Sequence, residues 1–548
     1  MNRMDRRAFL GRAGMGMVGA AVGVGAMGQG RVWGQAGDKR PNIVVILADD
    51  MGYSDLGSYG GEIETPALNG LAAKGLRFKQ SYNTARCCPT RASLMTGLHP
   101  HQGGIGWMTR SPESPEKFDW GTDGYHGVLN RNCVTIAEVM KEAGYHTYMV
   151  GKWHLGFDAK EQWPLQRGFE RYYGILSGAC NYYRPGGKRG LTLDNEMVQP
   201  EGEDYYVTDA FTDHAIEFVE GQEDSRPFFM YVAYNSPHWP LHAKAEDVAK
   251  YRGKYKKGWD VLRKERHARM VEMGLVKKEW QPDGPDAPAW TELDEAKQDE
   301  MDLRMATYAA QVDRMDQNIG RLMAALEGAG KLENTLVMFL SDNGACQEGG
   351  ELGGGKAADI NRKDGPLFVT VGQAWAHASN TPYRRYKHYV HEGGISTPLI
   401  VHWPAGLKYG GGRMTDAPGY LPDIMATCVE AGEATYPRYY QNYRIPPLVG
   451  KSLLEVFRTG RRDGHEYMCW EHEGHGAIRW GKWKAIQDEL GTWQWELYDV
   501  EADRTEQYDL AMDRPGLVKE LSEKWYEWAW EHKVFPKHPD GIGPYETY

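Results

Sequence analysis

The chain has 548 residues, 25% of them charged, with 67 glycines and 19 tryptophans, a composition typical of a loop-rich globular α/β protein and not of a fibrous or disordered one. Its length suffices for one large hydrophobic core and a smaller second unit. The formal net charge of −11 argues against a nucleic-acid partner, because no overall positive field would neutralise phosphates; an anionic substrate would need a local basic site.

The N-terminal residues have the pattern of an export signal. Arg6 and Arg7 resemble a twin-arginine signal, and residues 14–28 form a glycine- and alanine-rich apolar run that is too short for a membrane span. We therefore expect residues 1–36 to be a signal peptide read by the Tat translocase, and the mature chain to be periplasmic or secreted without a membrane span. Because residues 1–36 contain five arginines and one aspartate, their removal would change the formal charge from −11 to −15.

The first predicted strand ends in two adjacent carboxylates. Residues 41–48 form a continuous apolar run rich in β-branched side chains, as expected for a strand buried on both faces. Asp49 and Asp50 follow directly, and open α/β sheets bind their ligands at the carboxyl ends of strands. The pair is therefore a candidate ligand site, although an aspartate pair that caps a turn would give the same pattern.

Residues 87–97 predict a helix that begins at a pair of cysteines. Pro89 has no N–H to lose and a preset φ, so it suits the first turn of a helix. Cys87 would then lie at the helix N-terminus, which favours an anion, and Arg91 would add donors that match a tetrahedral oxyanion. A buried cysteine pair or half of a metal site remain alternatives. The seven cysteines in all are too sparse, and odd in number, for a disulfide framework.

Two further predicted strands lead to basic side chains. Residues 145–150 are followed by Lys152 and His154, which could face the same side because they lie two residues apart on an extended chain. Residues 227–234 predict a strand that leads to His238. A solvated loop would explain the Lys-x-His pair as well, and a hydrogen-bonded structural histidine would explain His238.

Two long stretches of the chain lack a strand pattern. Residues 243–315 are charged and helical in pattern, and we expect their charged face to be solvated surface. The glycine-rich residues 349–356 and the chain onward to Ser379 are expected to be irregular. Aromatic side chains in residues 157–184, 345–380 and the charged stretch could stack on sugar or aryl groups, so these segments are expected to select the substrate.

A second buried strand, residues 335–341, delivers two more oxygen-bearing side chains, Asp342 and Asn343. Together with Asp49 and Asp50 they would form four hard oxygen ligands from two strand ends. Such a set favours Ca²⁺ or Mg²⁺ over zinc, which prefers histidine and thiolate. The sequence therefore predicts a site for a hard divalent cation.

The pattern changes beyond about residue 450, where short aromatic-rich segments separated by turns suit an antiparallel sheet. A helix over residues 515–530 would pack on that sheet. We therefore expect a large domain over residues 37–450 and a smaller one over residues 451–548. The predicted strands of the smaller domain are residues 477–480, 483–486 and 495–499.

Several motifs together resemble the type I sulfatases, most closely the bacterial arylsulfatases of the alkaline phosphatase superfamily. They are Cys-x-Pro-x-Arg at 87–91 with Met-Thr-Gly at 95–97, Gly-Lys-Trp-His-Leu-Gly at 151–156, the charged insertion 243–315 and Glu-Leu-Tyr-Asp at 496–499. The resemblance implies an alkaline-phosphatase-like α/β fold with a large mixed β-sheet sandwiched by helices. It also implies that a formylglycine-generating enzyme oxidises Cys87 to formylglycine.

The resemblance further implies a mechanism for hydrolysing a sulfate ester. The hydrated aldehyde at position 87 would attack sulfur, the alcohol would leave, and the covalent sulfoenzyme would then release sulfate. His238 would protonate the departing oxygen, and His154 would accept a proton from the second hydroxyl group. The metal, Ca²⁺ in preference to Mg²⁺, would be held by Asp49, Asp50, Asp342, Asn343 and an oxygen of modified Cys87. The groups expected to hold the sulfate are Arg91, Lys152, His238 and Lys387.

Two other functions fit the same sequence. A phosphodiesterase or phosphonate monoester hydrolase of the same superfamily would need similar ligands. A non-catalytic sulfoglycan-binding protein would keep Cys87 as an unmodified thiol. The substrate class, an aryl sulfate or a sulfated carbohydrate, stays open at this point.

Overall fold

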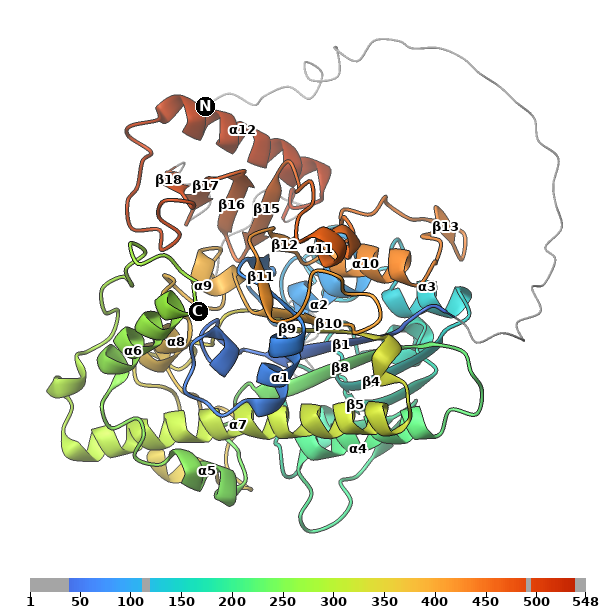
Figure 1. Cartoon of the computed structure of the whole chain (residues 1–548), viewed down its shortest axis with the longest axis horizontal. Coiled ribbons are helices and arrows are strands. Elements are labelled where there is room, and N and C mark those ends of the chain that lie inside the picture. The colour runs from blue at the N-terminus through green and yellow to red at the C-terminus, as the bar shows by residue number, and fades with distance from the viewer. Residues whose placement is uncertain (1–38, 111–118, 489–493, 538–548) are drawn as a thin grey trace. The chain divides into compact units, whose positions relative to one another are not determined.

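The computed structural model describes residues 39–110, 119–488 and 494–537; the expected signal peptide, residues 1–36, lies outside them. The main feature of the described residues is a ten-stranded mixed β-sheet (Figure 1). Its order is β11-β2-β10-β9-β1-β8-β4-β5-β6-β7. The strands are β1 Asn42–Asp49, β2 Leu76–Phe78, β4 His146–Lys152, β5 Arg171–Ile175, β6 Leu191–Leu193, β7 Glu196–Val198, β8 Phe228–Pro237, β9 Thr335–Ser341, β10 Leu399–His402 and β11 Arg413–Thr415.

The centre of this sheet is parallel and buried on both faces. β1 pairs in parallel with β8 on one side and with β9 on the other, so that Val45 lies opposite Tyr231 and Met338. β4 continues the parallel pairing beside β8, whereas β10 runs antiparallel to β9. Every residue of β1 after Asn42 is buried, which explains the continuous apolar run in the sequence. The carboxyl ends of β1, β4, β8 and β9 therefore meet at one edge of the sheet.

Helices cover both faces of the sheet, as the sequence predicted. Val44 and Ile46 of β1 pack in one apolar cluster with α1, α4 and α7, whereas Ile43 and Val45 pack in another with α2, α3 and α10. Figure 1 shows the two layers on opposite sides of the strands. The first layer holds α1 Pro66–Lys74, α4 Val207–Glu220, α5 Ala245–Tyr251, α6 Trp259–Glu272, α7 Glu295–Gly328 and α8 Gln373–Ser379, and the second holds α2 Cys87–Thr96, α3 Ile136–Glu142, α10 Asp423–Ala431 and α11 Leu454–Thr459.

A smaller antiparallel sheet follows in the C-terminal part, covered by α12 Pro515–Glu531. Trp525 of α12 is fully buried, and its Nε1 donates a hydrogen bond to the carbonyl oxygen of Trp470 at 2.9 Å. The chain from Lys39 onward clusters as one compact unit, so the division near residue 450 stays a prediction. The strands are β15 Met468–His472, which the sequence interpretation missed, β16 His475–Trp480, β17 Trp483–Gln487 and β18 Glu496–Asp499.

The remaining described elements are short. β3 Ser81–Tyr82 pairs with β12 Gly419–Tyr420, β13 Tyr439–Tyr440 pairs with β14 Tyr443–Arg444, and α9 spans Glu392–Ile395. Among the helices described, none combines the length and the apolar character that crossing a bilayer requires.

Two expectations, that the charged face of residues 243–315 is solvated and that the chain from residue 349 to Ser379 is irregular, are wrong in part. Arg266 of α6 is fully buried and not solvated, because its guanidinium pairs with Asp55 at 2.7 Å and with Glu62 at 2.8 Å, and a paired charge can be desolvated where a lone one cannot. The stretch expected to be irregular contains α8, a seven-residue helix. Seven residues after a glycine-rich run are too few to give a clear helical period.

Candidate active site

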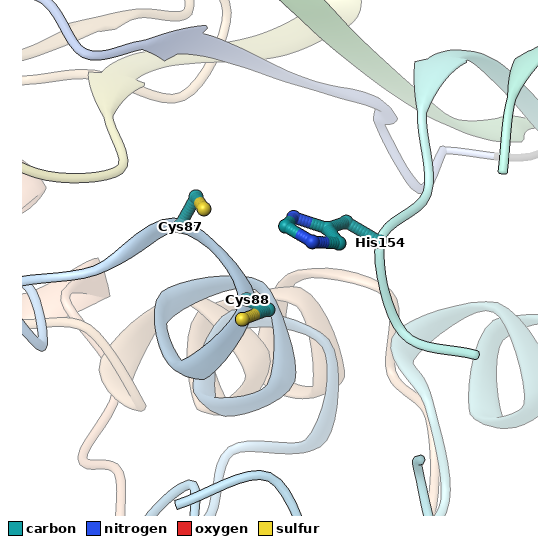
Figure 2. A group of neighbouring side chains, drawn as sticks. All are labelled: Cys87, Cys88 and His154. Carbon is teal, nitrogen blue, oxygen red and sulfur yellow. The ribbon is translucent and has the colours of Figure 1, made fainter. Parts of the chain in front are cut away.

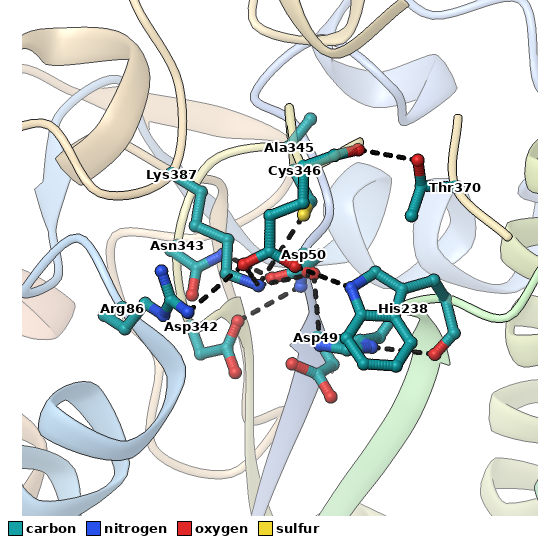
Figure 3. Close-up of polar contacts among 12 residues, drawn as sticks. Asp49, Asp50, Arg86, His238, Asp342, Asn343, Ala345, Cys346, Thr370 and Lys387 are labelled. Atoms are coloured by element: carbon teal, nitrogen blue, oxygen red, sulfur yellow. Dashed lines mark hydrogen bonds and ion pairs between the residues drawn. The ribbon is translucent and has the colours of Figure 1, made fainter. Parts of the chain in front are cut away.

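Side chains from four strand ends and one helix start meet at the carboxyl edge of the central sheet. Figure 3 shows those from the ends of β1, β8 and β9 together with Lys387. β1, β4 and β8 deliver aspartates, a lysine and a histidine, and the segment after β9 delivers an aspartate and an asparagine. Each of the ten residues that the sequence singled out is at most 6% exposed. They are Asp49, Asp50, Cys87, Arg91, Lys152, His154, His238, Asp342, Asn343 and Lys387.

Cys87 is the first residue of α2, as the position of Pro89 predicted. Thr90 fixes this helix start, because its hydroxyl group donates to the carbonyl oxygen of Asp342 at 2.7 Å and accepts from the backbone N–H of Thr84 at 3.1 Å. The start of α2 is thereby tied to the end of β9. Cys87 consequently sits at the edge where the strands deliver their polar side chains.

The two adjacent thiols have different surroundings (Figure 2). The side chain of Cys87 faces the imidazole of His154, and the pKa of Cys87 lies well below the usual thiol value because Cys88 hydrogen-bonds to it and Lys152 and His154 favour the thiolate. The Sγ atom of Cys88 lies 3.4 Å from the carbonyl oxygen of Trp107. Burial raises the pKa of the Cys88 thiol well above its usual value. Cys87 is therefore the reactive member of the pair.

The alternative of a thiolate metal site has a geometric basis. The ligand atoms of Cys87, Cys88 and His154 lie within 4.8 Å of one another. A zinc site of this kind would use both sulfur atoms. Of the two cysteines, Cys87 lines the cavity at this edge of the sheet and Cys88 does not. Burial raises the pKa of the Cys88 thiol, which disfavours the thiolate that a metal would bind. These differences favour a single reactive group over a two-sulfur metal site.

Asp49 and Asp342 are held by two buried cations. The Nζ atom of Lys152 donates to both carboxylate oxygens of Asp49, at 3.0 and 2.7 Å. Nη2 of Arg91 lies 2.8 Å from Asp342 and 3.5 Å from Asp49. Both cations are fully buried and neither lines the cavity. Their expected role of holding sulfate oxygens stays a prediction. In this structure they balance the carboxylates that are buried beside them.

Asp50 faces the cavity side of the same cluster. Its Oδ2 atom lies 2.9 Å from Nζ of Lys387 and 3.5 Å from Nε2 of His238. Burial alone would raise the pKa of Asp50, but Lys387 and His238 outweigh it and lower that pKa. Lys387 lines the cavity, so its ammonium group is placed both to neutralise Asp50 and to meet an anion from the cavity.

The donor set fits a hard divalent cation. The side-chain N–H group of Asn343 donates to Oδ1 of Asp50 at 2.7 Å, while Oδ1 of Asn343 is buried without a hydrogen-bond partner among the described residues. Burial raises the pKa of Asp49 well above its usual value and also raises the pKa of Asp342. A bound cation would coordinate the unpartnered amide oxygen and would favour the ionised form of the neighbouring carboxylates.

The two candidate histidines reach the cavity in different ways. His154 has a φ of +55°, so the expected extended chain from Lys152 is wrong; the turn directs His154 toward Cys87. Its ring packs so closely on Gly178 that a Cβ there would lie 2.7 Å from Cε1. Nδ1 of His238 donates to the carbonyl oxygen of Trp239 at 2.8 Å, which leaves Nε2 for proton exchange. Burial lowers the pKa of His154 to about 4 and that of His238 to about 3.

A cavity of about 200 Å³ opens over these groups. Cys87, His154, His238 and Lys387 line it together with apolar side chains, among them Phe157. Two histidines, a cation and a reactive side chain thus share one small space. The charged lining residues that the sequence interpretation missed are Arg86, Arg110, Arg189 and Glu348.

Glu348 lines the cavity. No pattern in the sequence marks it, because it lies beside a glycine-rich loop. It accepts a hydrogen bond from Nε1 of Trp239 at 2.7 Å and pairs with Arg86 at 3.1 Å. Lys387 and Arg86 outweigh the effect of burial and hold the pKa of Glu348 well below its usual value. Arg86 could have been noticed, since it directly precedes the cysteine motif.

The C-terminal sheet contacts Arg86, one of the residues that line the cavity. Glu473, in the turn between β15 and β16, accepts a hydrogen bond from Nε1 of Trp107 at 2.8 Å. Its carboxylate lies 3.7 Å from Nη1 of Arg86 and contacts His388. The small sheet therefore braces the residue that precedes Cys87.

Comparisons with known proteins agree with this geometry. The family described as "Sulfatase" matches residues 41–433. An uncharacterised sulfatase of Schizosaccharomyces pombe is 34% identical over 93% of this chain and 97% of its own length. An arylsulfatase of Klebsiella aerogenes is 31% identical over 77% of this chain and 93% of its own. A solved structure described as Ps i-CgsB in complex with k-i-k-neocarrahexaose has a TM-score of 0.66 at 26% identity and covers 91% of this chain and 94% of its own.

Proposed function

Because this chain belongs to the sulfatase family and is a sulfuric ester hydrolase, we propose that it works through a formylglycine made from Cys87. The observation that carries this proposal is the position of Cys87 at the start of α2, lining a small cavity with His154, His238 and Lys387. When present, the hydrated formylglycine would supply the nucleophile that takes up the sulfuryl group and then releases it as sulfate.

The side chains around position 87 would bind the sulfate group and transfer protons. Lys387 faces the cavity and would hold the sulfate oxygens as charge develops on them. His154 faces position 87 and would accept a proton there. His238, once Nε2 is also protonated beside Asp50, would give that proton to the departing alcohol oxygen and return to the neutral ring with its proton on Nδ1. Arg91 and Lys152 would hold the carboxylates of Asp49 and Asp342 in place and partly offset the effect of burial on their ionisation.

We also propose a calcium ion in this site, with magnesium as the second choice. Asp49, Asp50, Asp342 and Asn343 would hold it, and a mixed set of carboxylate and amide oxygens suits the loose coordination of Ca²⁺. Such an ion would supply Lewis-acid polarisation of the sulfate and a template for its orientation. The unpartnered Oδ1 atom of Asn343 supports this assignment.

Sulfated carbohydrates are the substrate class that the comparisons favour. The complex of the 26% identical structure with k-i-k-neocarrahexaose supports a carbohydrate substrate, and the 31% identical relative is named an arylsulfatase. Export through the Tat translocase to the periplasm, after modification of Cys87 in the cytoplasm by a formylglycine-generating enzyme, completes the proposal. It is supported by the twin-arginine pattern of residues 1–36.

The modification is tested by mass spectrometry of the tryptic peptide that contains residues 87–91, prepared from the native host. Conversion of the thiol to formylglycine makes this peptide roughly 18 Da lighter. A Cys88→Ala variant should still show the loss, and a Cys87→Ala variant should not. An intact, alkylatable thiol at Cys87 would instead support the non-catalytic sulfoglycan-binding protein.

The phosphodiesterase alternative is tested by measuring kcat/KM on an aryl sulfate and on the matching aryl phosphodiester. We expect the sulfate ester to be hydrolysed faster, because the family model and the 31% identical relative are both described as sulfatases. Faster turnover of the phosphodiester would contradict the proposal and assign the same residues to phosphoryl transfer.

A further inference from the structure

Trp239 contacts the imidazole ring of His238 in two ways. Its carbonyl oxygen accepts a hydrogen bond from Nδ1 of His238 at 2.8 Å, and its indole packs on the imidazole with ring centroids 4.5 Å apart. The first contact keeps a proton on Nδ1, and the second limits rotation of the imidazole. The direction of Nε2, which lies 3.5 Å from Oδ2 of Asp50, therefore depends on the position of Trp239.

Trp239 is held through the backbone on one side and through its indole on the other. The backbone carbonyl oxygen of the preceding residue, His238, accepts from the hydroxyl group of Tyr182 at 2.8 Å. The indole Nε1 donates to Oε2 of Glu348 at 2.7 Å, and the indole packs edge-to-face on Phe368. The side chain of Glu348 is 18% exposed, whereas Phe368 is 47% exposed. Glu348 therefore supplies the more buried and the more directional of these two contacts.

Glu348 is fixed by contacts of its own. Its Oε1 atom lies 3.1 Å from Nη2 of Arg86 and 3.3 Å from Nε2 of His388. Its carbonyl oxygen accepts from the hydroxyl group of Thr370 at 2.6 Å (Figure 3). The carboxylate thus presents Oε2 to the indole in one direction. Because Arg86 directly precedes the start of α2, the same carboxylate also connects that helix start to the segment that carries His238.

The bonding of Glu348 fits an orienting role better than contact with the sulfate group. Glu348 lines the cavity, but each of its carboxylate oxygens already has a protein partner, Arg86 for Oε1 and Trp239 for Oε2. A carboxylate directed at a bound anion would repel it, whereas one that faces a guanidinium and an indole N–H has its charge offset. The carboxylate is therefore used to hold its neighbours in place.

We propose that Glu348 is a positioning residue for proton transfer by His238, and that it acts through the indole N–H of Trp239. This inference rests on the proposed function, in which His238 protonates the departing oxygen. While the indole is fixed, Nε2 of His238 stays directed into the cavity. Without the hydrogen bond from the indole, the imidazole can turn, and the departing oxygen leaves without its proton. Neither Glu348 nor Trp239 exchanges a proton in this role.

The test compares two aryl sulfates of nearly the same size whose leaving groups differ in their need for a proton. 4-Nitrophenyl sulfate releases a stable phenolate, whereas 4-methoxyphenyl sulfate releases a phenol of pKa about 10. Glu348→Leu removes the acceptor for the indole, so kcat on 4-methoxyphenyl sulfate should fall about 30-fold, and kcat on 4-nitrophenyl sulfate less than about threefold. KM should stay within about twofold of the wild-type value for both esters.

Two results of this comparison would overturn the proposal. An equal fall in kcat on both esters would show that Glu348 only keeps the site folded. A rise in KM at unchanged kcat would assign Glu348 to substrate binding. Glu351→Leu is the matched control, because it removes an exposed glutamate three residues further along the same loop. It should leave both parameters at their wild-type values.

A conservative variant and a double-mutant cycle isolate the hydrogen bond itself. Glu348→Gln keeps an oxygen that can accept from the indole, so it should retain most of the kcat on 4-methoxyphenyl sulfate; a loss as large as that of Glu348→Leu would refute the role of the bond. Trp239→Phe keeps an aromatic ring without the N–H group and should reproduce the loss. The double variant Glu348→Leu/Trp239→Phe should lose no more than either single variant, whereas additive losses would contradict the proposal.

Failure of the proposed function is recognised separately, because the wild-type protein would then hydrolyse neither sulfate ester. Crystal structures of the wild-type protein and of Glu348→Leu test the inference in that case. The rings of Trp239 and His238 should be displaced in the variant. Unchanged positions of both rings would refute the positioning role, whatever reaction the protein catalyses.

Discussion

Two fully buried ionic clusters in this protein differ in how completely their polar atoms are bonded. In the first, which we call the bridging cluster, Glu392 accepts from Lys484 at 3.0 Å and from Arg504 at 2.7 Å. Glu506 also accepts from Lys484, at 2.7 Å, and the hydroxyl group of Ser396 accepts from Arg504 at 2.6 Å. No side-chain polar atom of these five residues is both buried and without a hydrogen-bond partner.

The catalytic cluster, formed by Asp49, Asp50, Asp342, Asn343 and the cations around them, is not saturated. Oδ1 of Asn343 and Nε of Arg91 are buried without partners among the described residues. The pKa shifts do not separate the two clusters, because burial raises the pKa of Asp49 and of Glu506. Neighbouring cations lower the pKa of Asp50 in one cluster and lower that of Glu392 to about 2 in the other. Buried charge alone therefore does not mark a functional site; unused bonding capacity beside a cavity does.

The largest effect expected is the loss of turnover on removing the reactive side chain. Cys87→Ala should reduce kcat on the order of 10⁴-fold or more, because no other group can replace the nucleophile. Cys88→Ala should keep most of the activity, since its thiol lies away from the cavity. Steady-state kinetics on an aryl sulfate measures both, and an equal loss in the two variants would contradict the assignment.

Metal binding should stabilise the catalytic cluster and leave the bridging cluster unaffected. Ca²⁺ at about 100 times its Kd should stabilise the metal-free protein by about 2.7 kcal/mol, measured as a rise in the unfolding midpoint. Asn343→Leu should lose most of this rise, because it removes the oxygen atom that lacks a partner. A chelator should remove most of the activity. A wild-type midpoint that responds to neither Ca²⁺ nor Mg²⁺ would contradict the metal site.

Breaking the bridging cluster should instead lower the free energy of unfolding and have little effect on turnover. Lys484→Met leaves Glu392 and Glu506 buried without their shared cation, which should lower the free energy of unfolding by about 3–5 kcal/mol. Lys482→Met removes a cation that is 43% exposed and pairs with Asp499, so it should cost about 1 kcal/mol or less. Urea unfolding measures both. Equal costs would show that the bridging cluster does not stabilise the fold.

The smallest effect expected is on the pH dependence of stability. The pKa of Glu392 is lowered to about 2, so its stabilising effect is full above the unfolded pKa near 4.5 and is lost as the pH falls toward 2. The maximum contribution is about 3 kcal/mol. Glu392→Gln should therefore flatten the fall in unfolding free energy between about pH 5 and about pH 3. The exposed Glu466→Gln serves as the control, and a parallel fall in all three proteins would refute the link.

Local sequence patterns correctly predicted the strands and the helix start that position the site. The apolar runs that become β1 and β9 ended at the expected aspartates, and Pro89 correctly set the start of α2 at Cys87. These features depend on a few neighbouring residues, on strand burial and on the first turn of a helix. The mixed sheet with helices on both faces and the small C-terminal sheet are likewise confirmed.

Features set by distant contacts could not be predicted in the same way. The pairing of Arg91 with Asp342 and the reach of Glu473 toward Arg86 join segments that no local pattern connects. His154 has a positive φ, and its ring packs on Gly178, which belongs to a separate segment of the chain. Long-range pairings of this kind decide which cations face the cavity and which lie beneath it.

The position of Glu473 has a consequence for the order in which the protein is made. A ribosome delivers Arg86 and Cys87 early and the β15–β16 turn late, and chains tend to fold from the N-terminus as they emerge. The cysteine motif is therefore synthesised well before the carboxylate that braces it. A nascent chain can present Cys87 before the β15–β16 turn has been made, and completing the last sheet adds the contact between Glu473 and Arg86.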